Sequence, residues 1–399
     1  MTRQLLLLFV AVCLAVSTAH AQKGIQFRAA KIGDVFKAAK QTGKPVFVEV
    51  FSPTCHVCQS FMPTLENPRV GSFYNSKFIS TRVDIGDKAI QAWLESRKLF
   101  VPSLPLFLYF DPNQSLIHFA MSNNSVEEVV RHGTNALTPA VRSQGMKARY
   151  AAGERSANFL IDYGMYARVT RDTTANIKAM EDYARQQSTT TYASNTNWLV
   201  MQKLVMDLDN PMFQYLMSHP AEYKSYDREQ VKNVAENILM SSLYSARGAG
   251  YSPAKILQVK QQLIQIGIDP KVATNRTLLP EVNAYFRQNQ TAKAVSRMDG
   301  HVATNPFTTL EYLYISRLFN RQSTDASDVP TVVKWLNKAL TGGAVTPKEQ
   351  ADLYFELAEA HRRGGKVTDA NKAAQKSMEM AQMARLDTRR NVEQMAKLK

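Results

Sequence analysis

Cysteine is scarce in this sequence, and that scarcity excludes a fold held together by a set of disulfides. The 399 residues contain three cysteines, of which Cys13 lies in an apolar N-terminal segment. Cys55 and Cys58 are therefore the thiols expected in the mature chain, spaced as a single Cys-x-x-Cys. In an exported protein, a single pair of this kind indicates redox chemistry rather than structural cross-linking.

Long apolar runs are also lacking beyond the N-terminus, so no later segment is expected to span a membrane. Residues 1–21 combine Arg3, an apolar run at residues 5–16, and small residues at Ala19 and Ala21. This pattern predicts a signal peptide cut after Ala21, and a periplasmic or secreted mature protein. The alternative location is the eukaryotic secretory pathway. A buried helix or a membrane anchor is the alternative, but the run is shorter than the roughly 20 residues that span a bilayer.

Acidic residues are outnumbered, yet the positive excess is diffuse. The sequence has 49 basic and 34 acidic residues, a net charge of +15. Without a dense basic patch or interleaved aromatic residues, a nucleic-acid partner is not expected.

Histidines other than His56 show no ligand spacing, and a zinc site with Cys55 and Cys58 would normally need four ligands. We therefore expect no metal and no organic cofactor.

Residues 22–137 alternate between strand and helix patterns and close on a hairpin. This order predicts an α/β domain with a central mixed sheet flanked by helices. The expected strands are at residues 25–28, 46–51, 78–84, 106–110 and 116–120. The expected helices are at residues 31–41, from Cys55 with an interruption at Pro63, at 87–99 and at 125–137.

This region resembles the thioredoxin fold over residues 25–137. The resemblance is carried by residues at matching spacing: Cys55 and Cys58 after the central strand, Pro63 eight residues after Cys55, Glu49 six residues before it, and Pro105 just ahead of a strand. The segment Asn67-Pro68-Arg69-Val70 is similar to a segment of the periplasmic subgroup of thioredoxin-like proteins. The sequence Thr54-Cys55-His56-Val57-Cys58 departs from the family's usual Trp-Cys-Gly-Pro-Cys.

A dithiol at a helix start predicts distinct roles for its two sulfurs. Unpaired backbone N–H groups and the helix dipole stabilise a thiolate at the first position, so Cys55 is the expected nucleophile and Cys58 the resolving thiol. Glu49 is the expected proton acceptor for Cys58, because burial favours the protonated form of a carboxyl group. The alternative is an ion pair between Glu49 and Arg82 on the neighbouring strand.

The resemblance also implies substrate contacts. Pro105 corresponds to the family's cis-proline, whose loop faces the dithiol and offers backbone hydrogen bonds to a substrate chain. Leu104 and Pro105 are therefore candidate substrate-binding residues, and a tight turn is the alternative. His56 either stabilises the Cys55 thiolate when protonated or is an exposed imidazole with little effect.

Residues 138–399 read as helices joined by short polar turns, which predicts an all-α domain of helical hairpins. Residues 307–383 resemble tetratricopeptide units, since Tyr354, Ala358, Ala370 and Ala374 recur at the expected spacing. Such a solenoid would offer a concave surface to a protein partner. A plain helical bundle is the alternative.

These observations predict an exported thiol–disulfide oxidoreductase that acts on protein thiols or disulfides. Work outside the cytoplasm would require a membrane electron donor or acceptor. The rival hypothesis is a non-catalytic interaction or assembly protein, in which the helical domain binds a partner and the dithiol is vestigial or regulatory.

Overall fold

The computed structural model describes residues 24–398, which form two compact units. The first unit extends to Asp227 and the second begins at Arg228. The predicted signal peptide lies outside the described residues. No helix within residues 24–398 is both long and apolar enough to cross a membrane.

The first unit is built on a four-stranded mixed sheet with the strand order β2-β1-β3-β4. Its strands are β1 (Val46–Phe51), β2 (Ile79–Asp84), β3 (Leu106–Phe110) and β4 (Leu116–Ala120). β1 runs parallel to β2 and antiparallel to β3, and β3 and β4 form the antiparallel hairpin. Nearly every residue of β1 and β3 is buried, because helices cover both faces of the sheet.

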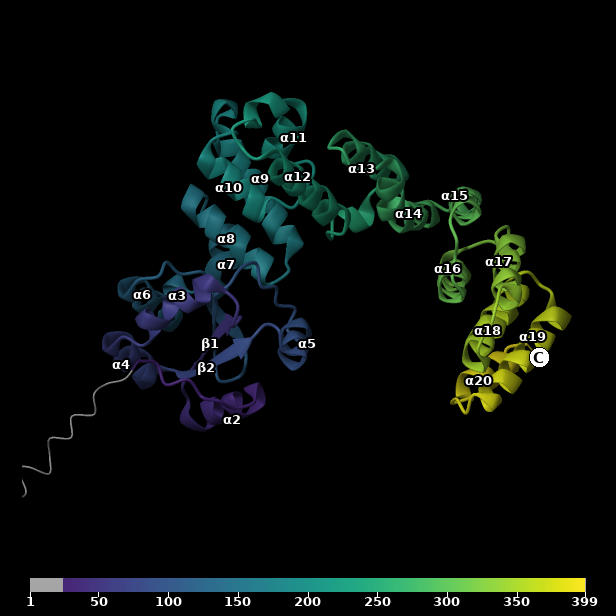
Figure 1. Ribbon diagram of the computed structural model, residues 1–399, viewed down its shortest axis with the longest axis horizontal. Helices are drawn as coiled ribbons and strands as arrows, with labels where there is room; N and C mark the ends of the chain where they lie inside the picture. The colour runs from purple at the N-terminus through teal and green to yellow at the C-terminus, as the bar shows by residue number, and fades with distance from the viewer. Residues whose placement is uncertain (1–23, 399) are drawn as a thin grey trace, which may run out of the picture. The chain divides into compact units, whose positions relative to one another are not determined.

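Two groups of helices enclose this sheet (Figure 1). On one face lie α2 (Ile32–Thr42) and α5 (Lys88–Ser96), whose Phe36 and Trp93 rings contact Phe110 of β3. On the other face lie α3 (His56–Leu65), α4 (Pro68–Lys77) and α6 (Val126–Leu137), which share a core with Phe47, Phe107 and Tyr109. This architecture is the thioredoxin-like α/β fold expected from the sequence.

Two local predictions in this unit are wrong. The short strand expected at residues 25–28 is only a single bridge, between Phe27 and Ser80. The interruption expected at Pro63 does not occur, because α3 continues through Pro63 to Leu65. Packing explains the continuation: Leu65 is buried in the core, and the next backbone N–H, that of Glu66, bonds to the Met62 carbonyl oxygen at 2.9 Å.

Helices complete the first unit, in agreement with the helical pattern of residues 138–399. Two 3-10 turns, Pro139–Val141 and Ser143–Gly145, precede the first of these helices. The predicted domain boundary at residue 137 falls inside this unit and stays a prediction. The helices are α7 (Met146–Ala151), α8 (Ala157–Val169), α9 (Thr173–Gln186), α10 (Asn195–Leu204) and α11 (Pro211–Ser218).

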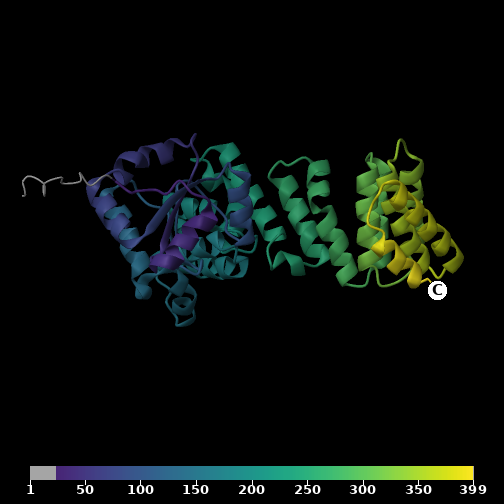
Figure 2. The same cartoon turned by 90° about the horizontal axis from the view of Figure 1, so that it is seen from below.

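The second unit is entirely helical where it is described, and most helices that follow one another in sequence lie side by side (Figure 1, Figure 2). The predicted all-α architecture is therefore confirmed. Its helices are α12 (Arg228–Leu243), α13 (Pro253–Gln265), α14 (Pro270–Arg287), α15 (Thr291–Thr304), α16 (Thr309–Gln322), α17 (Val329–Thr341), α18 (Pro347–Arg363), α19 (Val367–Met383) and α20 (Arg389–Ala396).

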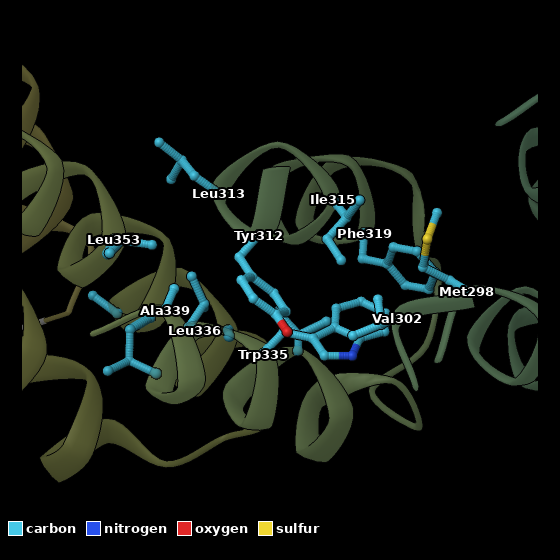
Figure 3. Packing of buried hydrophobic residues seen from close by; sticks show 14 of the residues in the cluster. Met298, Val302, Tyr312, Leu313, Ile315, Phe319, Trp335, Leu336, Ala339 and Leu353 are labelled. Atoms are coloured by element: carbon cyan, nitrogen blue, oxygen red, sulfur yellow. The ribbon is translucent and has the colours of Figure 1, made fainter. Parts of the chain in front are cut away.

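Aromatic packing holds the middle of the second unit together. Trp335 of α17 is fully buried, and its ring meets that of Phe319 from α16 edge to face at 5.1 Å (Figure 3). Ala358 of α18 and Ala370 of α19 are fully buried in the same cluster. Small side chains allow these two helices to approach closely. The resemblance to a tetratricopeptide unit stays a prediction.

A glycine in α6 provides a test of the first unit's core. The Tyr74 hydroxyl is fixed between the Tyr109 hydroxyl and the Val129 carbonyl oxygen, each at 2.7 Å. A Cβ at Gly133 would lie 3.0 Å from that hydroxyl and 2.5 Å from the Phe73 ring. We expect Gly133→Ala to lower the free energy of unfolding by about 1–3 kcal/mol, because overpacking outweighs the better helix propensity of alanine.

Chemical denaturation of the two proteins would measure this difference. Gly33→Ala in α2 is the matched control, since a Cβ there meets no atom within 4 Å. It should be neutral or stabilising by up to about 1 kcal/mol. Equal stabilisation by both substitutions would contradict the packing described around Tyr74.

Candidate active site

The two cysteines occupy the first turn of α3. Cys55 is the N-cap residue, and its Sγ accepts a hydrogen bond from the backbone N–H of Cys58 at 3.2 Å. Cys55 is partly exposed, whereas Cys58 is 1% exposed. A sulfur at an N-cap faces the unpaired N–H groups of the first turn, an arrangement that stabilises a thiolate. The geometry therefore separates an accessible sulfur from a protected one.

Glu49 lies in β1 on the face of the sheet that α3 covers. It shares this face with Phe47, two residues earlier, which packs in the core beneath α3, and it pairs in register with Arg82 of β2. The carboxylate is fully buried, and its Oε2 lies 2.6 Å from the Arg82 Nε. This short contact is an ion pair, and the Arg82 Nη2 also donates a hydrogen bond to the Glu49 Oε1 at 3.4 Å.

The structure thus contains the ion pair that the sequence left open as an alternative for Glu49. Burial nevertheless raises the pKa of Glu49, and the charge of Arg82 only partly opposes that effect. The carboxyl group therefore holds a proton more readily than an exposed glutamate. Pairing with Arg82 and proton exchange with a nearby thiol are compatible roles.

The pKa of Cys58 is raised to about 11, and burial is the largest cause. Its hydrogen bond with Cys55 and the negative charges of Cys55 and Glu49 act in the same direction, while a backbone hydrogen bond at Ser52 opposes them. At neutral pH Cys58 is consequently a thiol. It needs a proton acceptor before it can attack a disulfide.

The strand register brings the proline loop to the dithiol. Val50 pairs with Leu106, so Pro105 lies beside the end of β1, from which the chain runs to Cys55. The peptide bond between Leu104 and Pro105 is cis, as the resemblance implied. Pro105 is buried and Leu104 is partly exposed. Both predicted substrate contacts therefore lie at the same edge of the sheet as Cys55.

His56 is the first residue of α3 and is exposed. Its neighbour Val57 is also exposed, at 55%. The surface around Cys55 therefore presents both an imidazole and an apolar contact to an incoming chain.

The helical segment after residue 137 also reaches this site, which sequence analysis did not predict. The backbone N–H of Phe100 bonds to the Val169 carbonyl oxygen at 2.8 Å, and Arg171 pairs with Glu95 at 2.6 Å. A pocket of about 330 Å³ lies there, lined by Leu104 and Arg171 among others. Leu104 thus links the proline loop to a pocket that the helical segment helps to form.

Within residues 24–398 no group of three or more histidine, cysteine, aspartate or glutamate residues could hold a metal ion. His118 is buried, and its Nδ1 lies 2.7 Å from the Ser143 hydroxyl, which ties β4 to the turn before α7. Burial lowers its pKa to about 3, so it stays neutral in the core.

Replacing Glu49 should make the Cys58 thiol more acidic. Glu49→Gln removes a negative charge that disfavours the Cys58 thiolate and leaves the positive Arg82 nearby. We expect the pKa of Cys58 to fall below its value of about 11, measured from the Cβ chemical shift of the reduced protein during a pH titration. Glu66→Gln, an exposed position at the end of α3, is the control. An unchanged Cys58 titration in Glu49→Gln would contradict the proximity of the two groups.

The same carboxyl group should make stability depend on pH. Because its pKa is raised in the folded protein, the unfolded chain loses this proton first as pH rises above the ordinary value of 4.5. The contribution is complete below that pH and is lost as pH rises through the folded pKa. Urea unfolding of the reduced protein should show this decline relative to Glu49→Gln. Parallel pH profiles for the two proteins would argue against a raised pKa.

Comparison with known proteins gives little beyond this geometry. No protein-family model matches the sequence, and no curated protein matches it. Among solved structures, a disulphide isomerase from Xylella fastidiosa Temecula1 matches with 13% sequence identity and a TM-score of 0.22. The match covers 28% of this chain and 86% of that one.

Proposed function

We propose that this protein is an exported thiol–disulfide oxidoreductase that acts on protein substrates through Cys55 and Cys58. The observation that carries the proposal is the hydrogen bond from the Cys58 backbone N–H to the Cys55 sulfur at the start of α3. It gives the accessible sulfur a donor that stabilises negative charge, with a second thiol one turn away.

In the reductive direction, the Cys55 thiolate attacks one sulfur of a substrate disulfide. A mixed disulfide forms, and the other substrate sulfur leaves as a thiolate that takes up a proton. Cys58 then loses its proton and attacks the Cys55 sulfur, which releases the second substrate thiolate. Two electrons pass to the substrate, and Cys55 and Cys58 become a disulfide; the reverse sequence donates that disulfide.

Glu49 is suited to take the Cys58 proton in this cycle. The raised pKa of Glu49 lies closer to the pKa of Cys58, which is about 11, than the pKa of an exposed glutamate would. A smaller difference between the two pKa values favours proton transfer. When Glu49 is deprotonated, the positive charge of Arg82 compensates the negative charge of its buried carboxylate. In this proposal Arg82 is a positioning residue, because it acts through Glu49.

Leu104, Pro105 and the exposed surface at His56 would hold the substrate chain against Cys55. Because the surface around Cys55 is exposed, a polypeptide chain can reach it, which supports protein thiols and disulfides as substrates. With export, turnover would further require a membrane electron donor or acceptor to reset the dithiol.

Two variants test the catalytic proposal. Cys55→Ser should reduce insulin-reduction activity at least about 100-fold, because the attacking sulfur is lost. Cys58→Ala should instead accumulate mixed disulfides, visible as dithiothreitol-sensitive bands on a non-reducing gel. The double variant Cys55→Ser/Cys58→Ala is the matched control and should trap nothing.

If Cys55→Ser reduces insulin as fast as the parent protein, the dithiol is not catalytic. The non-catalytic interaction protein then becomes the better hypothesis. Trapping by the double variant would show that the captured bands do not depend on Cys55.

A further inference from the structure

A groove between α14 and α15 gathers basic side chains that thiol chemistry does not use. Its volume is about 730 Å³, within the range of ligand-binding sites. Lys271, Lys293, Arg297 and His301 line it, and no carboxylate does. Arg297 of α15 donates to the Thr274 carbonyl oxygen of α14 at 3.4 Å, so the two helices are joined at the floor of the groove.

The groove face of α15 is distinct from its packing face. Met298 and Val302 belong to the core of the second unit, where they lie near Phe319 and Trp335 (Figure 3). Lys293, Arg297 and His301 recur at intervals of four residues along the groove. Hydrophobic burial therefore accounts for one face of the helix, but not for the basic one.

The positive charge in the groove is only partly compensated. Arg297 pairs with the buried Glu281, with 2.8 Å between Nε and Oε2. Lys271 and Lys293 are both exposed, and neither makes an ion pair within residues 24–398. Two lysine charges thus remain for a ligand.

His301 lies in the same positively charged environment. Burial lowers its pKa, and the charges of Arg297 and Lys271 lower it further, while Glu311 opposes them. A histidine whose protonation is disfavoured by its neighbours marks a region of positive potential. An anionic group would be attracted to that region.

We propose that this groove binds an acidic segment of a partner polypeptide. Charge complementarity with Lys271 and Lys293 identifies the occupant as carboxylate-rich. The hollow shape favours an extended chain over a flat bilayer surface. A Cβ added to Gly300 would meet no atom within 4 Å, so a partner backbone has room to approach α15.

Binding of a fluorescein-labelled hexaglutamate peptide to the full-length protein tests this proposal by fluorescence anisotropy. The double variant Lys271→Glu/Lys293→Glu should bind at least about 10-fold more weakly, because two attractions become repulsions. Added salt should weaken binding to the parent protein.

Lys348→Glu/Lys366→Glu is the matched control. Both lysines are exposed in the second unit and lie outside the groove, and the change in net charge is the same. This variant should retain the parent affinity. An equal loss in the control would show attraction by net charge alone and would overturn the proposal.

A third variant tests the shape of the site without changing its charge. Gly300→Gln places a side chain in the open space of the groove and is compatible with the helix. It should weaken peptide binding at least about 5-fold, and full affinity would overturn the assignment to this groove. Absence of peptide binding by the parent protein would also overturn it.

Two further probes distinguish other anions from a peptide. Inorganic phosphate that displaces the peptide at an equal concentration of charge would reassign the groove as a small-anion site. Phosphatidylglycerol vesicles that bind the parent protein, but not Lys271→Glu/Lys293→Glu, would reassign it as a membrane-contact surface. Circular dichroism of every variant would exclude misfolding as the cause of lost binding.

Discussion

A fully buried carboxylate in the central strand constrains the first unit. An unpaired charge at Glu49 would cost several kcal/mol in the core, so a cation has to lie opposite it. Arg82 meets that requirement, and its guanidinium group lies 4.1 Å from the centre of the Phe51 ring. A one-residue slip between β1 and β2 would break this pair and turn Glu49 to the other face of the sheet.

A second pairing of the same strand determines where the candidate site lies. β1 pairs antiparallel with β3, so the end of β1 lies beside the start of β3, and the dithiol and Pro105 meet at one end of the sheet. Glu49, whose buried charge Arg82 compensates, is therefore also the group proposed to exchange a proton with Cys58. Fold stability and the proposed redox chemistry both involve this pair, so changes at Glu49 or Arg82 are expected to affect both.

Local patterns in the sequence predicted most of this site. The buried strand before Cys55, the helix that Cys55 caps and the proline ahead of β3 are each visible within a few residues. The contact of Phe100 with Val169 and that of Glu95 with Arg171 have no such local signal, because they join segments about 70 residues apart. The continuation of α3 past Pro63 likewise depends on core packing that a proline pattern does not express.

In the helical part, the sequence predicted the all-α architecture but not every helix, and α15 is one that it did not identify. Its only buried apolar side chains are Ala294, Met298 and Val302, with Gly300 on the opposite face, so the apolar stripe is narrow and easily missed. The groove beside α15 could not be predicted for a related reason. It depends on which faces of α14 and α15 meet, and the sequence does not specify that.

The link between Phe100 and Val169 bears on how this protein can be divided. A fragment cut after residue 137 would keep the sheet and both thiols, yet it would lose the segment that supports the loop leading to Leu104. Its reactivity toward small disulfides would report on Cys55 alone. Selectivity among the proposed protein substrates would have to be measured on a piece that extends at least to Asp227.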